Sequence, residues 1–238
     1  MNTINNLPIK VFADGASIKE FINLNKNPII KGFTTNPSLM KNNGIVDYSL
    51  FALELLSIIK TKPISFEVFA DELEEMKEQA FKINSWGENV YVKIPVTNTK
   101  GISVVPLIKH LQEKKIKLNI TAVFSKEQIQ KILFILKEDI PSIISIFCGR
   151  IADTGQDPGK LIRFAKQKIK KNSKIEILWA STRELLNIFQ ANDLGTDIIT
   201  VPNELLKKLD LIGKNLDEYS LETVKSFYQD AKSSKYSI

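Results

Sequence analysis

The chain has 238 residues, of which 43% are hydrophobic and 25% charged, with a net charge of +6 at pH 7. This size and balance predict a soluble globular protein with a large core, and α/β barrels of this length are commonly one domain. The basic charge does not predict nucleic-acid binding, because the lysines are scattered among acids. The densest run, residues 166–174 (KQKIKKNSK), has no interleaved aromatic residue and is typical of a solvated helix end. An anionic small substrate suits the charge equally well.

Cysteine and histidine are each present once, as Cys148 and His110. A single cysteine excludes an internal disulfide and a cysteine-based zinc cluster, and this agrees with a reducing cytoplasm. A single histidine argues against a histidine triad or a multi-histidine metal site, so no metal is expected. The start, MNTINNLPIK, lacks the basic and apolar regions of a signal peptide, and no segment has the length of a membrane span. We therefore expect a cytoplasmic chain without membrane contact.

Short β-branched segments alternate with longer amphipathic segments along the chain. The short segments are bounded by turn-forming residues and are predicted strands. They cover residues 9–13, 29–33, 64–69, 89–97, 117–122, 142–148, 175–180 and 198–201.

The longer segments are predicted helices. Ser17 and Ser125 are expected to cap two of them, and Ser125 has the spacing of a capping box. Residues 149–157 are predicted to be a loop, Pro158 to be a first helical residue, and Ser181 to open the following helix. The predicted helices cover residues 17–25, 47–60, 71–83, 101–114, 203–209 and 216–232, with others starting at 125, 158 and 181 and a short one after 38; the tail after 232 is expected to fray.

This succession of strand-and-helix units predicts a single parallel (β/α)8 barrel, a TIM barrel, with an extra C-terminal helix. Residues 1–238 are predicted to form one domain. The alternative is a doubly wound open sheet, which we disfavour because no Gly-x-Gly-x-x-Gly and no Walker loop follows a strand. In a barrel, chemistry is expected at the C-terminal ends of the strands.

Lys93 lies inside an apolar strand, NVYVKIPVT, two residues before Pro95. Because proline cannot donate to a sheet, Pro95 is expected to end the strand and to leave Lys93 near its C-terminal rim, facing as Tyr91 does. Such a lysine can snorkel out of an edge strand or pair with a carboxylate. It can also be a nucleophile, because desolvation disfavours the ammonium and a free amine forms a Schiff base with a carbonyl. Glu67, in the preceding apolar strand, is its expected neighbour.

Other polar side chains interrupt or follow the predicted strands. Each has a simpler alternative role: Asp14 can form an Asp-Gly turn, Ser181 can cap a helix, and the arginines can face solvent. Their position at strand ends predicts a polar site at one rim of the barrel. The set comprises Asp14, Thr34, Thr35, Asn36, Ser65, Asn119, Thr121, Ser145, Arg150, Ser181 and Arg183.

These positions resemble the transaldolase family, from the first strand through the helix after the seventh. The motifs that carry the resemblance are VFADGAS, GFTTNPSL, ISFEV, VYVKIPVT, LNITAVFS, SIFCGRIAD and WASTRE. TTNPS and the VKIP core are the specific ones, and all the motifs follow in the family's order.

The resemblance implies a role for each site residue. Lys93 would be the Schiff-base lysine, Asp14 the acid/base at the C4 hydroxyl of the ketose, and Glu67 with Thr121 the holders of a proton-shuttling water. The implied reaction, in the pentose phosphate pathway, transfers dihydroxyacetone from sedoheptulose 7-phosphate or fructose 6-phosphate to glyceraldehyde 3-phosphate or erythrose 4-phosphate, without metal or organic cofactor. The implied substrate-binding residues are Thr34, Asn36, Ser65, Asn119, Ser145 and Phe147, with Arg150, Ser181 and Arg183 on the phosphate.

The chain is shorter than the larger transaldolases and resembles the short branch, which includes fructose-6-phosphate aldolase. The aldolase branch carries tyrosine and glutamine where this chain has Phe147 and Glu67, so transaldolase activity is predicted. Two alternatives remain open: an aldolase that releases free dihydroxyacetone, and a barrel that binds phosphosugars without catalysis. The C-terminal helix could cover a barrel end or a neighbouring subunit, which leaves a homo-oligomer open.

Overall fold

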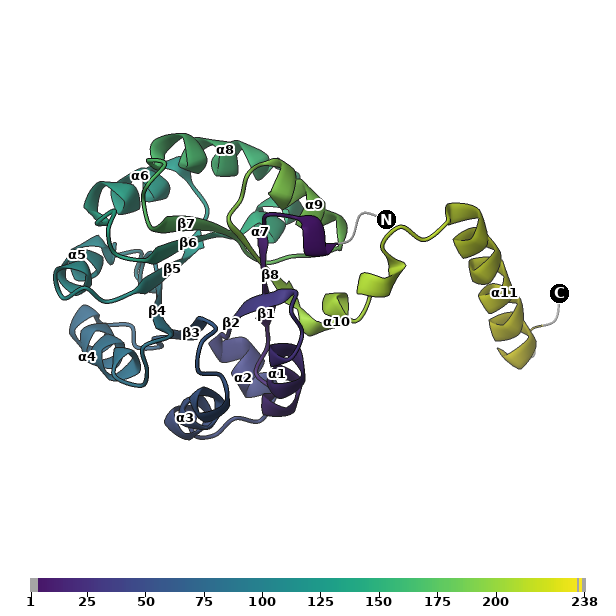
Figure 1. Ribbon diagram of the computed structural model, residues 1–238, viewed down its shortest axis with the longest axis horizontal. Helices are drawn as coiled ribbons and strands as arrows, with labels where there is room; N and C mark the ends of the chain where they lie inside the picture. Colours follow the sequence, from purple (N-terminus) through teal and green to yellow (C-terminus); the bar gives the residue numbers. More distant parts are fainter. Residues whose placement is uncertain (1–3, 235, 237–238) are drawn as a thin grey trace.

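The computed structural model describes residues 4–234 and 236. Within them, eight parallel strands close into a barrel in which each strand pairs with its sequence neighbours and β1 pairs with β8. Figure 1 shows the ring of strands with the helices outside it. The predicted TIM barrel is confirmed. The strands are β1 (Lys10–Asp14), β2 (Ile30–Thr34), β3 (Ile64–Glu67), β4 (Val90–Pro95), β5 (Leu118–Val123), β6 (Ser142–Ile146), β7 (Ile175–Trp179) and β8 (Ile198–Pro202).

Two of the predicted caps are confirmed, whereas Pro158 is the N-cap residue of the helix that begins at Gly159 and not the first helical residue. Ser17 accepts a hydrogen bond from the Glu20 amide, and Ser125 forms the expected capping box with Gln128. Pro95 ends its strand, as predicted. The helices are α1 (Ile18–Asn25), α2 (Pro37–Asn42), α3 (Tyr48–Ile58), α4 (Leu73–Asn84), α5 (Val105–Glu113), α6 (Lys126–Ile135), α7 (Cys148–Asp153), α8 (Gly159–Lys168), α9 (Leu186–Asp193), α10 (Asn203–Leu206) and α11 (Leu216–Ser234), with 3-10 turns at Ile4–Asn6 and Leu209–Leu211.

Two local predictions around β6 and β7 are wrong. Residues 149–157 were expected to be a loop, but α7 occupies most of this stretch. Ser181 does not open a helix: its φ is 64°, in the left-handed region, and α9 begins only at Leu186. The reason is a close approach, because a Cβ added at Gly149 would lie 1.6 Å from the carbonyl oxygen of Ser181. Because Gly149 has no Cβ, α7 can pack closely against the end of β7.

The barrel interior is apolar toward the N-terminal ends of the strands. Phe12, Ile143, Leu178 and Ile198 pack together there. Gly32 makes room for the ring of Phe12, since a Cβ at this glycine would lie 2.5 Å from it. Alternation along a strand places the next inward residue two positions further on. In several strands that residue is polar, so the polar side chains gather above the apolar plug at the C-terminal rim: Asp14, Lys93, Ser145 and Thr200.

The C-terminal helix α11 extends away from the barrel on a short linker (Figure 1). None of its residues is buried, and Phe227 and Tyr228 are 68% and 63% exposed. The predicted C-terminal helix is confirmed, and it does not cover the end of its own barrel. The tail after residue 232 was expected to fray, but residues 233 and 234 still belong to α11, and residues 235, 237 and 238 lie outside the described residues. Among the described helices, none has both the length and the apolar character needed to cross a membrane.

Candidate active site

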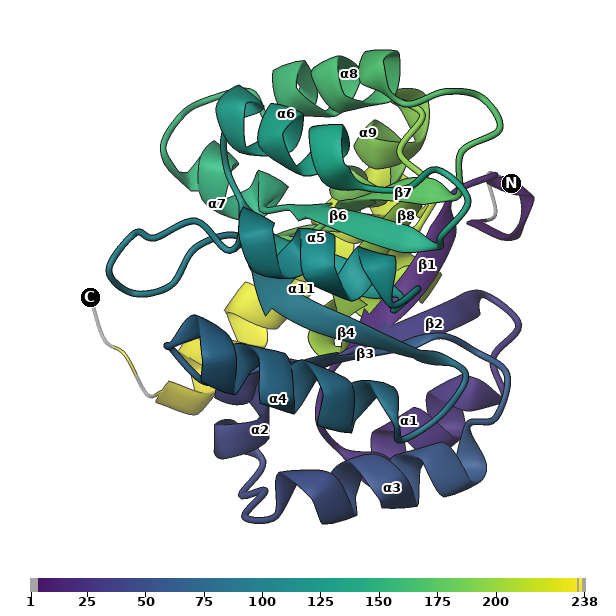
Figure 2. The same ribbon diagram turned by 90° about the vertical axis from the view of Figure 1, so that its left-hand side faces the viewer.

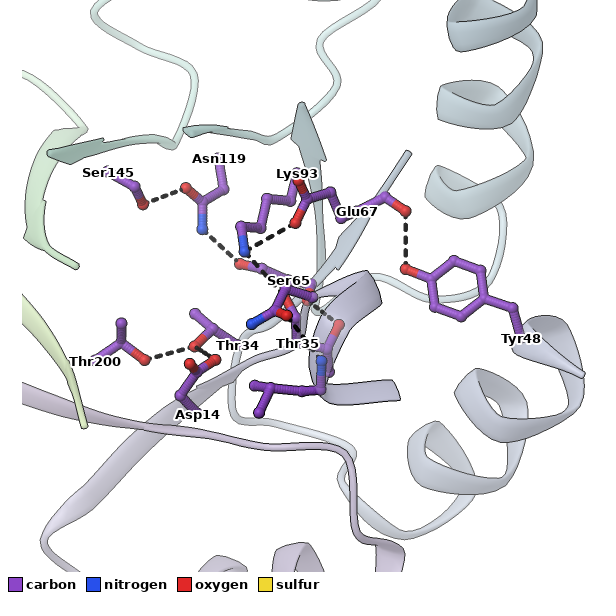
Figure 3. A network of polar contacts seen from close by, with 12 residues as sticks. Asp14, Thr34, Thr35, Tyr48, Ser65, Glu67, Lys93, Asn119, Ser145 and Thr200 are labelled. Atoms are coloured by element: carbon purple, nitrogen blue, oxygen red, sulfur yellow. Dashed lines mark hydrogen bonds and ion pairs between the residues drawn. The ribbon is translucent and has the colours of Figure 1, made fainter. Parts of the chain in front are cut away.

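Lys93 and Glu67 form an ion pair at the C-terminal rim of the barrel. They are paired in register on β4 and β3. Lys93 is 7% exposed, and its Nζ lies 3.0 Å from Glu67 Oε2. The same nitrogen donates a hydrogen bond of 2.9 Å to the backbone carbonyl of Thr35 (Figure 3). The pairing expected from the sequence is confirmed, and Lys93 does not snorkel out of its strand.

The TTNPS motif fixes the carbonyl that Lys93 contacts. Thr35 is fully buried and its hydroxyl donates to the carbonyl of Ser65, which ties the end of β2 to β3. Asn36 then caps α2: its side-chain oxygen accepts a hydrogen bond of 3.0 Å from the Leu39 amide, and Pro37 is the first helical residue. The capping bond uses the oxygen of Asn36 and leaves its amide nitrogen as the group that could donate to a substrate.

Asp14 ends β1 beside a chain of hydroxyl groups. Thr34 Oγ1 donates a hydrogen bond of 2.8 Å to Asp14 Oδ1. Thr34 Oγ1 also lies 2.5 Å from Thr200 Oγ1 (Figure 3). Burial raises the pKa of Asp14, while the charge of Lys93 and the hydrogen bond from Thr34 act in the opposite direction. Thr200 was not among the residues expected from the sequence, although this polar residue in the apolar segment IITVP is the same kind of signal as Ser65.

A second hydrogen-bonded chain crosses from β3 to β6. Asn119 Nδ2 donates to Ser65 Oγ at 2.9 Å, and Ser145 Oγ donates to Asn119 Oδ1 at 2.6 Å. All three side chains are buried. Figure 3 shows Asn119 and Ser145 on the opposite side of Lys93 from Tyr48. The structure therefore brings together three of the residues that the resemblance implied for substrate binding.

Thr121 follows Asn119 on the inward face of β5. Its hydroxyl is buried and has no hydrogen-bond partner within residues 4–234 and 236. The next residue, Ala122, has a φ of 57°, and the strand pairing is irregular at this point. Since buried polar groups are nearly always hydrogen-bonded, the Thr121 hydroxyl marks a place where water or a substrate group could bind.

Tyr48, at the start of α3, is a second residue that sequence analysis missed. Its hydroxyl donates a hydrogen bond of 2.9 Å to the backbone carbonyl of Glu67. The ring makes edge contacts with Phe66 and Trp86. Burial raises the pKa of Tyr48, so the phenol remains a protonated donor. Tyr48 thus fixes the backbone at Glu67 from outside the barrel; the sequence offered only an aromatic residue in an apolar helix.

Arg150, Ser181 and Arg183 lie on two segments that contact each other, α7 and the loop after β7. Arg150 is exposed, with its guanidinium 5.4 Å from the centre of the Phe147 ring. Arg183 forms an ion pair with Asp153, 2.5 Å apart, and its side chain is 51% exposed. The cavity beside Arg183, of about 560 Å³, is also lined by carboxylates. The guanidinium of Arg183 is therefore bound to the carboxylate of Asp153 and does not form a cluster with the side chains of Arg150 and Ser181.

Metal ligands do not gather anywhere in the part of the chain that the structure describes: no three His, Cys, Asp or Glu side chains are placed to hold an ion.

Comparison with known proteins gives the family. The profile of the family described as "Transaldolase/Fructose-6-phosphate aldolase" matches residues 11–238. The chain belongs to this family. A relative from Methanococcus maripaludis is 33% identical over 202 residues, covering 84% of this chain and 89% of the relative. One from Nitrosopumilus maritimus is 32% identical over 204 residues, covering 84% and 87%. Both carry the name "Probable transaldolase". Transaldolase-family membership supports an aldolase-type enzyme that acts on sugar phosphates.

Solved structures of similar architecture add evidence for the fold. The tryptophan synthase α subunit of Pyrococcus furiosus has a TM-score of 0.57 at 13% identity, covering 90% of this chain and 94% of that chain. A 2,3-dimethylmalate lyase has a TM-score of 0.56 at 11% identity, covering 96% and 84%. At such low identity these structures support only the barrel architecture of this transaldolase-family chain.

Proposed function

We propose that this protein is a transaldolase. It would transfer a dihydroxyacetone unit from sedoheptulose 7-phosphate or fructose 6-phosphate to glyceraldehyde 3-phosphate or erythrose 4-phosphate, in the pentose phosphate pathway of the cytoplasm. The observation that carries the proposal is the buried Lys93, placed at the C-terminal rim and paired with Glu67 on the adjoining strand. A buried ion pair contributes little to stability compared with apolar packing, so a lysine kept at this place favours a chemical role.

The first step is formation of the Schiff base. The ammonium of Lys93 must release a proton before its nitrogen can attack the C2 carbonyl, and Glu67 is close enough to accept it, directly or through a water. The hydroxyl of Thr121 is suited to hold that water, because it is buried and otherwise unpaired among the described residues. The carbinolamine then loses its C2 hydroxyl as water when Glu67 returns the proton, directly or through the water, and a protonated imine on Lys93 remains.

The second step breaks the C3–C4 bond. Asp14 accepts the proton of the C4 hydroxyl, which becomes the carbonyl of the departing aldose. The electron pair of the C3–C4 bond moves toward the imine nitrogen and leaves a three-carbon enamine on Lys93. Burial, which raises the pKa of Asp14, makes this carboxylate a better proton acceptor than an exposed aspartate. An acceptor aldose then reverses the step, and Asp14 returns the proton.

The remaining polar residues would bind the substrate. Hydroxyl recognition is assigned to the buried groups around Lys93, each of which has hydrogen-bonding capacity left for a ligand. The phosphate is assigned to the two arginines with Ser181, since guanidinium groups bind phosphate strongly. Phe147 would border the substrate between them. The hydroxyl-binding set is Thr34, Asn36, Ser65, Asn119 and Ser145, and the phosphate-binding set is Arg150, Ser181 and Arg183.

The alternative activity is an aldolase that releases free dihydroxyacetone. Release requires protonation of the enamine and hydrolysis of the imine, and a tyrosine hydroxyl at position 147 could supply that proton. Phe147 has no such group. The enamine should therefore persist until an acceptor aldose arrives, and this favours transfer.

Borohydride trapping tests the proposal. Reduction in the presence of fructose 6-phosphate should fix a covalent adduct on Lys93, detected by intact mass and located by peptide mapping. Lys93→Ala should abolish the adduct. Lys62→Met is the matched control, because Lys62 is a partly buried lysine that bonds to backbone carbonyls away from the rim, and it should leave the adduct unchanged. Full activity in Lys93→Ala would reject the Schiff base on Lys93. An unmodified wild type without transfer activity would favour the non-catalytic phosphosugar-binding barrel.

A further inference from the structure

Thr200 is a buried polar side chain at the rim that the mechanism above does not use. It faces the barrel interior from β8 and is 6% exposed, and its partner Thr34 on β2 is 2% exposed. Thr34 in turn donates to Asp14 on β1. The three side chains therefore form a hydrogen-bonded chain across the strands where the barrel closes (Figure 3).

The number of protons determines the direction of these hydrogen bonds. Each threonine hydroxyl carries one hydrogen, and an ionised carboxylate can only accept. When Asp14 is ionised, Thr34 must give its hydrogen to Asp14. The oxygen of Thr34 is then available only as an acceptor, so Thr200 must donate to it.

The same chain can reverse after Asp14 gains a proton. The carboxylic acid then donates to Thr34, and the hydrogen of Thr34 turns toward Thr200. Only hydroxyl rotations are needed, and no proton enters or leaves the threonines. The chain can thus adapt to both protonation states of Asp14.

The backbone holds Thr200 at a fixed distance from Asp14. Its carbonyl accepts a hydrogen bond of 2.7 Å from Thr182 Oγ1, and its Cα is paired with Phe12 on β1. Thr34 is paired in register with Asp14. Because a β-branched side chain has few χ1 rotamers, the Thr200 hydroxyl has little freedom to leave this position.

We propose that Thr200 is a positioning residue, which orients the Thr34 hydroxyl as a donor to Asp14 and thereby keeps Asp14 in the carboxylate form that accepts the C4 hydroxyl proton. This inference rests on the proposed transaldolase reaction. Thr200 acts through Thr34 and does not itself contact the reacting atoms.

The charges around Asp14 explain why one hydrogen bond matters. Burial raises the pKa of Asp14; the charge of Lys93 and the hydrogen bond from Thr34 lower it, and the carboxylates of Glu67 and Glu204 raise it further. Donation from Thr200 to Thr34 polarises the Thr34 hydroxyl and strengthens its bond to Asp14. Removing the Thr200 hydroxyl should therefore let Asp14 take up a proton at a higher pH.

The test is the pH profile of kcat/KM for transfer from fructose 6-phosphate to erythrose 4-phosphate. Thr200→Val should move the acidic limb upward by about half to one pH unit, which lowers activity on that limb by up to about tenfold. The value of kcat/KM on the alkaline plateau should change by less than about twofold, because Asp14 is ionised there. Thr200→Ser keeps the hydroxyl and should restore the wild-type limb.

A double variant separates positioning from a general structural effect. Thr34→Val should move the same limb at least as far, and adding Thr200→Val should move it no further, because Thr200 acts only through Thr34. Thr196→Val is the matched control: Thr196 is also a buried threonine near β8, and its hydroxyl has no partner among residues 4–234 and 236. It should leave the profile unchanged.

Three results would overturn the inference: an unmoved limb in Thr200→Val, an additional shift in the double variant, or an equal shift in Thr196→Val. If Thr200→Val does not fold by circular dichroism, Thr200→Ala serves with the same expectation. Borohydride trapping of the wild type is run alongside. Absence of the Lys93 adduct rejects the transaldolase reaction itself, whereas an adduct with an unmoved limb rejects only the role of Thr200.

Discussion

Glu67 and Lys93 occupy paired positions on neighbouring strands, and their charged atoms lie 3.0 Å apart with side chains only 16% and 9% exposed. Neither charge is well solvated, so each depends on the other. Tyr48 fixes the Glu67 carbonyl from one side, and Thr35 presents its own carbonyl to Lys93 from the other. The pair is thus held in place independently of a substrate.

Glu67→Ala should therefore destabilise the protein by about 3 kcal/mol, because it leaves the Lys93 ammonium buried beside a cavity. Glu67→Gln keeps a hydrogen-bond acceptor and should cost less, while still slowing Schiff-base formation. Urea unfolding and the rate of borohydride trapping measure the two effects. Glu74→Ala, which breaks an exposed ion pair with Lys77, is the control and should have little effect. Equal losses of unfolding free energy in Glu67→Ala and Glu74→Ala would contradict the dependence of Lys93 on Glu67.

Arg150→Ala and Arg183→Ala should each weaken phosphorylated substrates by about 2 kcal/mol or more, since a charge-assisted bond to phosphate is lost. Unphosphorylated analogues should be affected much less. Arg163→Ala is the matched control, because Arg163 is also a half-exposed arginine paired with an aspartate, Asp157. Comparison of KM for both substrate classes provides the measurement. If both classes lose affinity equally, these arginines do not bind the phosphate.

Arg183 must also exchange Asp153 for the phosphate when the substrate binds. An exposed ion pair of this kind contributes about 0–1 kcal/mol, so the competition is weak. Asp153→Asn should therefore lower KM for phosphorylated substrates by no more than about fivefold. A raised KM would instead mean that Asp153 holds Arg183 in its productive position.

Phe147→Tyr should raise the formation of free dihydroxyacetone from fructose 6-phosphate and reduce transfer to erythrose 4-phosphate. The added hydroxyl can protonate the enamine, which the wild-type side chain cannot do. Phe164→Tyr, on α8, adds the same hydroxyl away from the rim and should leave both activities unchanged. A wild type that cleaves fructose 6-phosphate rapidly without acceptor, with a variant that behaves identically, would identify an aldolase.

Asp14→Asn should abolish transfer and stabilise the fold near neutral pH. The native pKa of Asp14 lies above its ordinary value of 3.8, so the unfolded chain loses this proton first as the pH rises. Ionisation of Asp14 therefore begins to destabilise the fold as the pH rises above 3.8, and this loss of stability is complete once the pH passes the native pKa. We expect a rise in Tm of about 2–4 °C near pH 7, or ~1 kcal/mol.

Below about pH 4 the difference between Asp14→Asn and wild type should vanish, since Asp14 is then protonated in both the folded and unfolded states. Calorimetry across this pH range checks the sign. Asp139→Asn, at an exposed position, should show no such trend. A stability gain that grows toward acid pH would contradict the raised pKa.

The helix α11 leads to the expectation of a homo-oligomer. Its apolar side chains, including Leu216, Phe227 and Tyr228, are all exposed, whereas helices in proteins gain most of their stability from packing of an apolar face. The barrel itself exposes Val46 and Phe69 near the C-terminal rim. Light scattering should find a mass above the 26.9 kDa of one chain. A variant that ends at residue 214, and therefore lacks α11, should form an oligomer of fewer chains. A monomeric full-length protein would contradict this.

Sequence patterns were sufficient for the barrel and for the central part of the site. The strand that contains Lys93, its end at Pro95 and the caps at Ser17 and Ser125 depend on residues only a few positions apart, so local spacing predicts them. The neighbouring position of Glu67 follows because consecutive parallel strands pair. The resemblance of the motifs then led to the family that comparison confirmed.

The tertiary structure decided what depends on distant segments meeting. The chain from Thr200 through Thr34 to Asp14 exists only because barrel closure places β8 beside β1, 166 residues separating the two threonines. The left-handed turn at Ser181 depends on Gly149 packing against it. No residue of α11 is buried, so apolar packing within this chain does not determine where the helix lies relative to the barrel (Figure 1). Figure 2 shows the rest of the chain packed into one compact barrel, because only there do apolar faces meet.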